Sequence, residues 1–387
     1  MSTQRLSRPI VVLVVVMAVL AGTLGTVTGL RAFFAAHEPG PLVGPDSGAW
    51  LGAWVSSREG YSTAKRQAAI LDLEASVGRK LAIDHDYVGW GDPLGWQPAW
   101  DLRNGRMPLI SFGSQGDVRE VAQGRHDVYL RGLAAQVRAL GKPVFLRYAY
   151  EMDGVSNVGW VHSGRDYVAA WRHVHRLFDG LPVTWVWSPN ASAFGDPSRD
   201  VAQYWPGDDY VDWIAADGYN WYGCRGCKDW KEFGDIFRAF YHWGSARQKP
   251  LMIAEAGSTE DPADPGRKAA WLDRARAALK DMPDVKAVVW FDSAKDCGTW
   301  WLDSTSHAFA AFQRFARDAW LTPPTLSERR RLPSRPRRLG RMGSPVRFAG
   351  GSPPVYFAPR ESGAAATVER LQPGERWREC GARRTSL

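Results

Sequence analysis

Apolar runs recur at regular intervals between residues 50 and 320. Eight of them have the length and the β-branched and aromatic content of buried strands. They are Ala49–Val55, Lys80–Val88, Met107–Gly113, Pro143–Met152, Val183–Asn190, Asp212–Asn220, Pro250–Ser258 and Lys286–Ser293. Because the runs are almost continuously apolar, both faces of each strand should be buried, as they are in a parallel sheet.

Segments with helical periodicity lie between most of these runs. They are Ser62–Val77, His126–Leu140, Gly164–Phe178, Lys228–Ser245 and Gly266–Asp281, with His307–Trp320 after the last run. Helices are least clear after the second and fifth runs, where Trp, Gly, Pro and Asp dominate. This alternation predicts an α/β fold in which the sheet closes into a single (β/α)8 TIM barrel. An open doubly wound sheet would need a Gly-rich phosphate turn after its first strand, and the residues after Trp54 contain none.

The two ends of the chain differ from this pattern. Arg5 and Arg8 precede an uncharged, largely apolar stretch, so residues 1–36 are predicted to be a signal peptide or a signal anchor. We therefore expect a secreted protein, or alternatively a membrane-anchored one with its folded domain outside. Residues 322–387 are rich in Arg and Pro without apolar periodicity and are predicted to form a disordered tail. The barrel should occupy residues 37–321.

Charge is distributed unevenly along the chain. The net charge is +8, but residues 322–387 carry 14 Arg and 5 Glu, and residues 1–36 carry three Arg and no acidic residue. The remaining residues 37–321 have a net charge of −4, which argues against a nucleic-acid partner for the folded part. We expect membrane contact only through the N-terminal segment, and a monomer.

Four cysteines are too few for a disulfide scaffold in a chain of this length. Cys224 and Cys227 resemble half of a zinc site, but no second pair with metal-ligand spacing follows. The sequence therefore favours one disulfide, either Cys224–Cys227 or one of these with Cys297, and neither a metal nor a cofactor.

Catalytic residues of such barrels collect at the carboxyl ends of the strands. Glu151 ends the fourth run and Glu255 ends the seventh. Arg147 is a candidate salt-bridge partner for Glu151, because residues four apart in a strand share a face. Glu255 follows an apolar run that contains no cation. Strands four and seven can face each other across the barrel mouth. Two carboxylates and abundant aromatic rings, among them 20 Trp, suit the cleavage of glycosidic bonds.

Four ordered motifs carry a family resemblance. They are Arg147-x-x-x-Glu151-Met-Asp-Gly, Trp185-Val-Trp-Ser-Pro-Asn190, Asp212-Trp-x-x-x-Asp217-Gly-Tyr-Asn-Trp221 and Ile253-Ala-Glu255-x-Gly-Ser258. Together they resemble glycoside hydrolase family 26 over residues 47–321. The resemblance implies a secreted, retaining, endo-acting β-glycan hydrolase, most often an endo-β-1,4-mannanase. It implies that Glu151 is the general acid/base and Glu255 the nucleophile.

The same resemblance suggests a set of substrate-binding residues. In it Tyr219 matches a tyrosine that hydrogen-bonds the nucleophile, Trp290 matches the aromatic floor of the sugar site, and Trp160 matches a tryptophan after the acid/base motif. His85 is a candidate sugar ligand, with a loop histidine as the alternative. The full set is Arg147, Tyr150, His85, Trp160, Asn190, Asp217, Tyr219, Trp221 and Trp290.

The sequence departs from the family pattern beside the acid/base glutamate. Tyr150 stands where many mannanases have His, and Asp153 stands where Asn is common. The polysaccharide partner is therefore β-mannan or a related β-glycan, with β-1,3-1,4-glucanase and β-xylanase activities as the alternatives. A non-catalytic carbohydrate-binding barrel is a further alternative, which the presence of both carboxylates disfavours.

Overall fold

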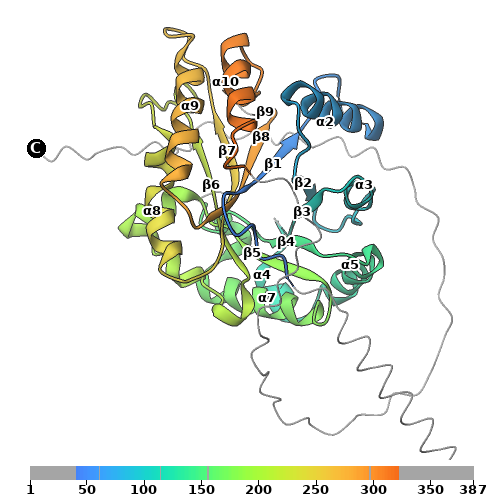
Figure 1. The fold of residues 1–387 in the computed structure, drawn as a ribbon. Coiled ribbons are helices and arrows are strands. Elements are labelled where there is room, and N and C mark those ends of the chain that lie inside the picture. Colours follow the sequence, from blue (N-terminus) through green and yellow to red (C-terminus); the bar gives the residue numbers. More distant parts are fainter. Residues whose placement is uncertain (1–40, 61, 114, 155–156, 296–297, 322–387) are drawn as a thin grey trace, which may run out of the picture. The chain divides into compact units, whose positions relative to one another are not determined.

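The protein forms a closed barrel of eight parallel strands (Figure 1). The computed structural model describes residues 41–60, 62–113, 115–154, 157–295 and 298–321. The strands follow one another around the barrel in sequence order. They are β1 (Trp50–Val55), β2 (Ile83–Val88), β3 (Met107–Phe112), β4 (Val144–Tyr148), β5 (Val183–Trp187), β6 (Trp213–Asn220), β7 (Leu251–Ser258) and β8 (Val285–Asp292). The predicted TIM barrel is thus confirmed, whereas the predicted signal segment and tail lie outside the described residues.

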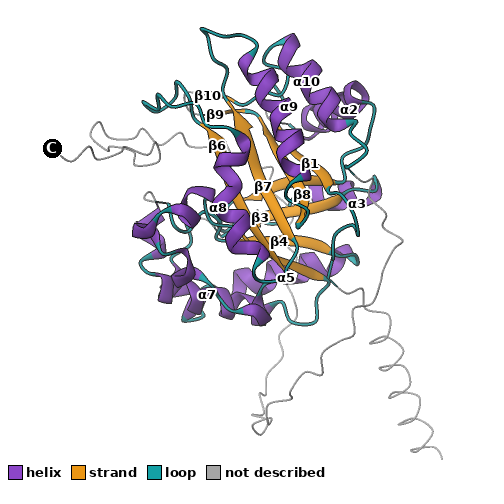
Figure 2. Cartoon of the chain, turned by 60° about the vertical axis from the view of Figure 1, so that its left-hand side comes forward, coloured by secondary structure: helices purple, strands orange, loops and turns teal. Residues whose placement is uncertain are grey.

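Helices cover the outside of the barrel (Figure 2). They are α2 (Thr63–Val77), α3 (Gln97–Arg103), α4 (Val118–Ala122), α5 (Asp127–Leu140), α6 (Val158–Val161), α7 (Gly164–Leu177), α8 (Phe233–Ser245), α9 (Arg267–Lys280) and α10 (Ser306–Ala316). Between β5 and β6 the chain forms only short 3-10 helices, η2 (Ala191–Gly195), η3 (Pro197–Arg199), η4 (Val201–Tyr204) and η5 (Asp208–Tyr210). The absence of a clear helical pattern after the fifth run therefore had a structural basis.

Local signals in the sequence set several helix ends. Ser62 and Ser163 cap α2 and α7, each accepting a hydrogen bond from a backbone N–H in the first turn. Gly78 ends α2 in the left-handed conformation, with φ of 73°, which glycine adopts without steric cost. Helix α2 accordingly begins within one residue of its prediction, and no long-range contact is needed to explain its bounds.

Side chains of alternate strand residues fill the barrel. Trp50, Phe145 and Trp213 pack together near the amino ends of β1, β4 and β6, with ring centroids 5.2–6.3 Å apart. Leu109, Ala254 and Val289 belong to the same buried interior cluster. Toward the carboxyl ends the interior becomes polar, because buried Ser111 and Arg147 follow Leu109 and Phe145 on the same strand faces. The core thus supports a polar layer at the barrel mouth.

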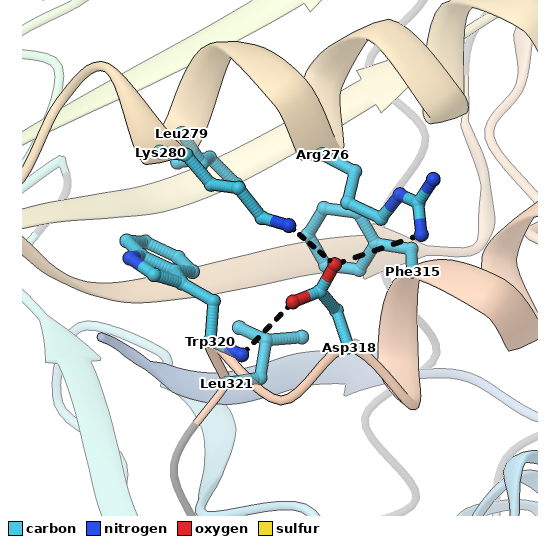
Figure 3. A pocket seen from close by; sticks show the side chains of 7 residues that line it. All are labelled: Arg276, Leu279, Lys280, Phe315, Asp318, Trp320 and Leu321. Atoms are coloured by element: carbon cyan, nitrogen blue, oxygen red, sulfur yellow. Dashed lines mark hydrogen bonds and ion pairs between the residues drawn. The ribbon is translucent and has the colours of Figure 1, made fainter. Parts of the chain in front are cut away.

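The opposite end of the barrel is closed by both ends of the described chain. Trp213 donates its indole N–H to the Leu42 carbonyl at 2.6 Å, and the Ala49 N–H donates to the Trp320 carbonyl at 3.1 Å. Asp318 accepts the Trp320 N–H and pairs with Lys280 of α9 at 2.8 Å (Figure 3). These contacts fasten the last described residues to β1, away from the carboxyl ends of the strands.

No helix within the described residues is long and apolar enough to cross a membrane.

Candidate active site

Arg147 lies at the centre of the polar layer at the barrel mouth. Its guanidinium is fully buried and donates to both oxygens of Asp217, at 2.7 and 2.8 Å, and to Glu255 Oε1 at 2.5 Å. Its Nε donates to Ser111 Oγ at 2.6 Å, and its Nη1 contacts Ser188 Oγ at 3.4 Å. A single cation from β4 therefore connects side chains from β3, β6 and β7 and from the residue that follows β5.

A break in the sheet register turns Glu255 toward the mouth. Met252 and Ala254 of β7 face the barrel interior, so strict alternation would turn the next residue outward. The pairing of β6 with β7 instead shifts between Ala216 and Asp217, so that Asp217 pairs with Glu255 and Ala254 is left out of the ladder. Irregularities of this kind re-aim side chains at functional sites. As a result, the side chains of two consecutive residues, Ala254 and Glu255, both point into the barrel.

Tyrosine hydroxyls surround the Glu255 carboxylate. Tyr219 donates its hydroxyl to Glu255 Oε2 at 2.5 Å, and the buried Tyr87 hydroxyl lies beside the same carboxylate. Burial and the Glu255 charge raise the pKa of Tyr87 and of Tyr219 well above their usual range. Both phenols therefore remain protonated and can donate to the carboxylate. Tyr219 stands where the sequence predicted it.

The two carboxylates that share Arg147 differ in their proton affinity. Burial alone would raise the pKa of Glu255, but Arg147 and the Tyr219 hydroxyl lower it below the usual value. Burial raises the pKa of Asp217 well above its usual range, and Arg147 opposes this shift only in part. One cation cannot balance two buried negative charges. Burial thus raises the proton affinity of Asp217, whereas Arg147 and Tyr219 stabilise the charged form of Glu255.

His85 contacts the same network from β2 and is neutral. Burial and the nearby cations Arg147 and Arg66 hold its pKa well below the usual range. Its Nε2 lies 2.7 Å from Ser111 Oγ and 3.3 Å from Arg147 Nη2. Arg147 can only donate, and Ser111 already accepts from Arg147 Nε, so Nε2 is the acceptor and Nδ1 carries the proton. No described residue accepts from this buried Nδ1.

Glu151 lies in a tight turn after β4. Ala149 and Glu151 both have left-handed backbone conformations, with φ of 46° and 52°, which cost about 1–2 kcal/mol each for residues with a side chain. The Glu151 N–H donates to the Ser188 carbonyl at 2.8 Å, which fixes the turn to the end of β5. The Glu151 charge contributes to the raised pKa of Asp217.

Two further residues that the sequence predicted for the site, Tyr150 and Asn190, lie beside the turn of Glu151, at the ends of β4 and β5. The Tyr150 ring covers the Arg147 guanidinium, 4.2 Å from its carbon to the ring centroid, and lies 5.8 Å from the Tyr87 ring. Asn190 is half-buried, and its backbone and side-chain N–H groups donate to Asp153 at 2.8 and 3.3 Å. Asp153, the residue where the family pattern commonly has Asn, thus binds the turn of Glu151 to the end of β5.

Aromatic side chains form the wall of the mouth on the side of β1, β6 and β8. Trp54, Phe291 and Trp300 make up a buried cluster, against which Tyr87, Tyr219 and Trp221 pack. The Trp300 ring lies 5.0 Å from Tyr219 and 4.8 Å from Trp221. Trp221 is partly exposed and carries Arg225 over its ring at 4.2 Å. Of these rings, only those of Tyr87, Tyr219 and Trp221 are partly exposed, and they offer flat surfaces on which sugars can stack.

Similarity to known proteins agrees with this arrangement. No protein-family model matches the chain. Endoglucanase H of Acetivibrio thermocellus is 30% identical over 283 residues, which are 69% of this chain and 30% of that protein. The β-1,3-xylanase TXYA of a Vibrio species is 26% identical over 49% of this chain and 42% of that protein. The chain thus spans less than half the length of each of these relatives.

Comparison with solved structures shows which known proteins share this fold. The catalytic domain of the family 26 endo-β-1,4-mannanase from Bacillus sp. JAMB-750 matches with a TM-score of 0.55 and 16% identity, over 72% of this chain and 88% of that one. The modular family 26 mannanase of Cellulomonas fimi matches with a TM-score of 0.54 and 15% identity, over 72% of both chains. The chain has the fold of glycoside hydrolase family 26. The predicted resemblance is confirmed at this level.

Within this family 26 fold, Trp290 is not where the sequence predicted it. Its ring is 1% exposed and points out of the barrel, where it packs against Trp271 of α9 and Phe312 and Phe315 of α10. The inward positions of β8 are Ala287 and Val289, so the next inward residue is Phe291, which belongs to the wall of the mouth. The prediction that Trp290 forms the floor of the sugar site is therefore wrong.

Other predicted roles also change. Trp160 of α6 is 9% exposed and belongs to the cluster between barrel and helices, so its face is not open to a ligand. Arg147 forms ion pairs with Asp217 and Glu255, so its charge serves the carboxylates of β6 and β7. Arg147, Asp217 and His85, which the sequence predicted to bind the substrate, are buried and not open to a sugar. They support the ionised Glu255 from beneath.

Several residues of the site were missed in the sequence. Ser111 and Ser188 bind Arg147, and Tyr87 lies beside Glu255. Each lies near the carboxyl end of its strand and points into the barrel. Tyr87 comes two residues after His85, and Ser188 comes two residues after Val186. These residues could have been found in the sequence by looking for polar side chains at inward-facing positions near the strand ends.

The described residues include two of the four cysteines and bear on the predicted disulfide. Cys224 and Cys227 are both disulfide-bonded, while Cys297 and Cys380 lie outside the described residues, so the predicted pairing stays a prediction. Among the described side chains, no three of His, Cys, Asp and Glu converge as metal ligands would.

Proposed function

We propose that the protein is a retaining glycoside hydrolase that cleaves internal bonds of a β-glycan. The observation that carries the proposal is the state of Glu255. A buried carboxylate is kept ionised by Arg147 and held by Tyr219 at the barrel mouth, beside an aromatic wall. An ionised, partly neutralised carboxylate is what attack on an anomeric carbon requires.

The reaction proceeds in two displacements. Glu255 attacks the anomeric carbon while Glu151 donates its proton to the departing glycosidic oxygen, which breaks the sugar–oxygen bond and forms a glycosyl ester on Glu255. Glu151, now ionised, takes a proton from water as that water attacks the ester carbon. Glu255 is released as a carboxylate and Glu151 is reprotonated. Arg147 stabilises Glu255 as the departing carboxylate in the second step.

β-1,4-Mannan is the first candidate substrate, on the basis of the motif resemblance around Glu151 and Glu255. Mannose differs from glucose in its axial 2-hydroxyl, so preference for mannan needs a polar group placed for that oxygen. Tyr150, whose ring covers Arg147, is the candidate group at the mouth.

A β-glucan is the second candidate substrate, and two observations favour it. The relative that is 30% identical to this chain is named an endoglucanase, and Tyr150 replaces the histidine common in mannanases. The β-1,3-xylanase relatives add β-xylan as a third polymer to test.

Carbohydrate binding without catalysis is the main alternative function. It would use the aromatic wall equally well, but it has no need for an ionised glutamate held by Arg147 and Tyr219. Burying a carboxylate and a guanidinium costs free energy unless their contacts offset it. A site that only binds sugars does not need a buried, ionised glutamate, so the buried pair of Arg147 and Glu255 favours catalysis.

The deciding experiment is a substrate screen of the purified protein. Mannan, galactomannan, mixed-linkage β-glucan, β-1,4-xylan and β-1,3-xylan are incubated with it, and the release of reducing ends is measured. The Glu255→Ala variant serves as the matched control for contaminating activity. Hydrolysis of at least one polymer by the wild type alone is expected, and binding without hydrolysis would refute the proposed activity.

The Tyr150→His variant separates the two main substrates. If the site is built for mannan, restoring histidine should retain or improve mannan cleavage. If it is built for a β-glucan, the variant should be no better on mannan than the wild type. Clean hydrolysis of mixed-linkage glucan with none of mannan would replace the first candidate with the second.

We also propose that the protein is exported and acts outside the cell as a monomer. The basic and apolar N-terminal pattern supports export, since a polymeric glycan cannot enter a cell intact. Fractionation of producing cells, with sequencing of the mature N-terminus, distinguishes a cleaved signal peptide from an anchor. Light scattering of the purified protein measures its mass in solution.

A further inference from the structure

The backbone of Glu151 is held by a pair of side chains that the proposed mechanism does not use. Glu151 accepts two hydrogen bonds at its carbonyl oxygen, from the Gly154 N–H at 2.9 Å and from Asn157 Nδ2 at 2.6 Å. Asn157 in turn accepts the indole N–H of Trp160 at its Oδ1, at 3.2 Å. A chain of hydrogen bonds thus runs from Trp160 through Asn157 to the main chain of Glu151.

The orientation of the Asn157 amide follows from its neighbours. An indole N–H can only donate, and a carbonyl oxygen can only accept. The amide oxygen must therefore face Trp160, and the amide nitrogen must face Glu151. Trp160 itself is anchored, because its ring is buried in the cluster between barrel and helices. Asn157 is consequently held at one end by the core and holds Glu151 with the other.

This support is placed where the backbone is unfavourable. Glu151 is in the left-handed conformation, which a residue with a side chain keeps only where its surroundings enforce it. Its N–H is bound by the Ser188 carbonyl, and its carbonyl by Gly154 and Asn157. The direction of the Glu151 side chain depends on this backbone conformation, because its Cα–Cβ bond turns with φ.

We propose that Asn157 and Trp160 are positioning residues that aim the carboxyl group of Glu151 by fixing its main chain. The inference deepens the proposed function and rests on Glu151 being the general acid/base. It assigns Trp160 a role in orienting the proton donor, in place of the sugar contact that its position after the acid/base motif suggested. Neither residue touches the substrate in this role.

The expected kinetic effect is selective. A misaimed Glu151 protonates the departing oxygen poorly, which slows only the substrates whose leaving group needs protonation. Displacement of a catalytic group by about 1 Å can cost on the order of 10²-fold in rate. kcat/KM should therefore fall by about that factor for poor leaving groups and should change little for 2,4-dinitrophenol. KM for the polysaccharide should stay constant, since the binding surface is intact.

The test uses three variants and a matched control in the full chain. Trp160→Phe keeps the buried ring but removes the N–H, Asn157→Ala removes the amide, and Asn157→Asp keeps an acceptor for Trp160 but cannot donate to Glu151. Asn104→Ala is the control, because Asn104 also donates its amide to a main-chain carbonyl, that of Trp100, but at the end of α3 on the opposite rim.

Two measurements keep this inference separable from the proposed function. Hydrogen exchange of the Glu151 amide needs no substrate, and it should become faster by about 10-fold or more in the three variants and not in the control. Unchanged exchange would overturn the inference whatever the activity. The second measurement is kcat/KM on dinitrophenyl β-mannobioside and β-cellobioside, whose leaving group needs no protonation, and on the polysaccharides, whose leaving sugar hydroxyl does.

The kinetic outcomes are equally distinct. A loss confined to the polysaccharides supports the inference. An equal loss on both leaving groups means that the pair is merely structural and overturns it. If the wild type hydrolyses no glycoside or polysaccharide, the proposed function fails, while the exchange data still decide whether Asn157 and Trp160 hold the Glu151 backbone. Trp160→Phe retains the ring in the core, so it provides a readout even if the Asn157 variants fold poorly.

Discussion

Arg147 and Glu255 meet across the barrel mouth, although they are 108 positions apart in the chain. The Nη2 of Arg147 lies 2.5 Å from Oε1 of Glu255, while its Nη1 binds Asp217. This contact keeps Glu255 ionised in a site that would otherwise favour the protonated acid. It also supplies the cation that the apolar strand β7 lacks.

The first prediction concerns the pH dependence of activity. The lowered pKa of Glu255 keeps it ionised below the usual titration range of glutamate, so activity should persist to acidic pH and be lost as pH falls through that pKa. In Arg147→Lys a single ammonium cannot serve both carboxylates as the guanidinium does. The acidic limb of kcat/KM against pH should move upward by about one pKa unit.

Asp217→Asn is the control for this shift. It removes the carboxyl group that competes for Arg147, and therefore should not raise the pKa of Glu255. An acidic limb that moves upward in Asp217→Asn, or stays in place in Arg147→Lys, would show that Arg147 does not set the ionisation of Glu255.

The second prediction separates the roles of the two glutamates. Glu255→Ala should abolish turnover of every substrate, because no glycosyl ester can form. Glu151→Ala should spare glycosides with activated leaving groups, and added azide should partly restore turnover by replacing the water that Glu151 activates. The measurement is kcat and kcat/KM on aryl glycosides with and without azide. Identical behaviour of the two variants across leaving groups would refute the assignment.

The third prediction is the stereochemical outcome. A nucleophilic Glu255 requires a separation of about 5–5.5 Å between its carboxyl group and that of Glu151, compared with about 6.5–9.5 Å in an inverting enzyme. The first product released should therefore be the β-anomer. Proton NMR of the anomeric region during early hydrolysis checks this, and an initial α-anomer would exclude the double displacement.

The fourth prediction contrasts two tryptophans. Trp290→Ala should lower the free energy of unfolding by about 3–5 kcal/mol, because it opens a cavity between β8 and the helices. It should leave KM unchanged. Trp221→Ala should raise KM while the melting temperature changes little, since Trp221 lies at the partly exposed edge of the mouth. Calorimetry and steady-state kinetics on both variants measure these effects. A raised KM in Trp290→Ala with little loss of stability would show that Trp290 is a sugar ligand after all.

The fifth prediction concerns the pH dependence of stability at the end of β8. Burial raises the pKa of Asp292 to about 7, with Asp303 adding to the shift and Lys268 and Arg58 opposing it. The folded state therefore holds a proton that the unfolded state releases near pH 4, so stability should fall as pH rises from about 4 to about 7.

The Asp292→Asn variant tests this prediction. Its amide oxygen can still accept the Leu302 N–H that Asp292 accepts at 2.8 Å, but it cannot ionise. Above pH 7 the variant should be more stable than the wild type by about 1–4 kcal/mol, and near pH 4 the two should be equal. Denaturant unfolding at several pH values measures the difference. A constant offset between the curves would mean that Asp292 does not carry the titration.

The sequence by itself determined the barrel and the location of its mouth. Eight nearly continuous apolar runs separated by helical periods leave few folds that bury every strand on both faces, and β1 and β7 begin within one residue of their predicted starts. Glu151 and Glu255 follow from the same argument, because parallel strands bring their carboxyl ends to one rim. These inferences depend on short-range periodicity, which a chain displays directly.

Only the tertiary structure decided how the side chains at that rim are used. The shift between Ala216 and Asp217 turns Glu255 inward, and the left-handed backbone of Glu151 sets the direction of its side chain. The alternation of inward and outward residues in β8 places Phe291, and not Trp290, at the mouth. Each of these features depends on pairing between strands or on a backbone angle held by distant contacts. A one-residue change in register moves a side chain to the opposite face, and periodicity within a single strand cannot reveal it.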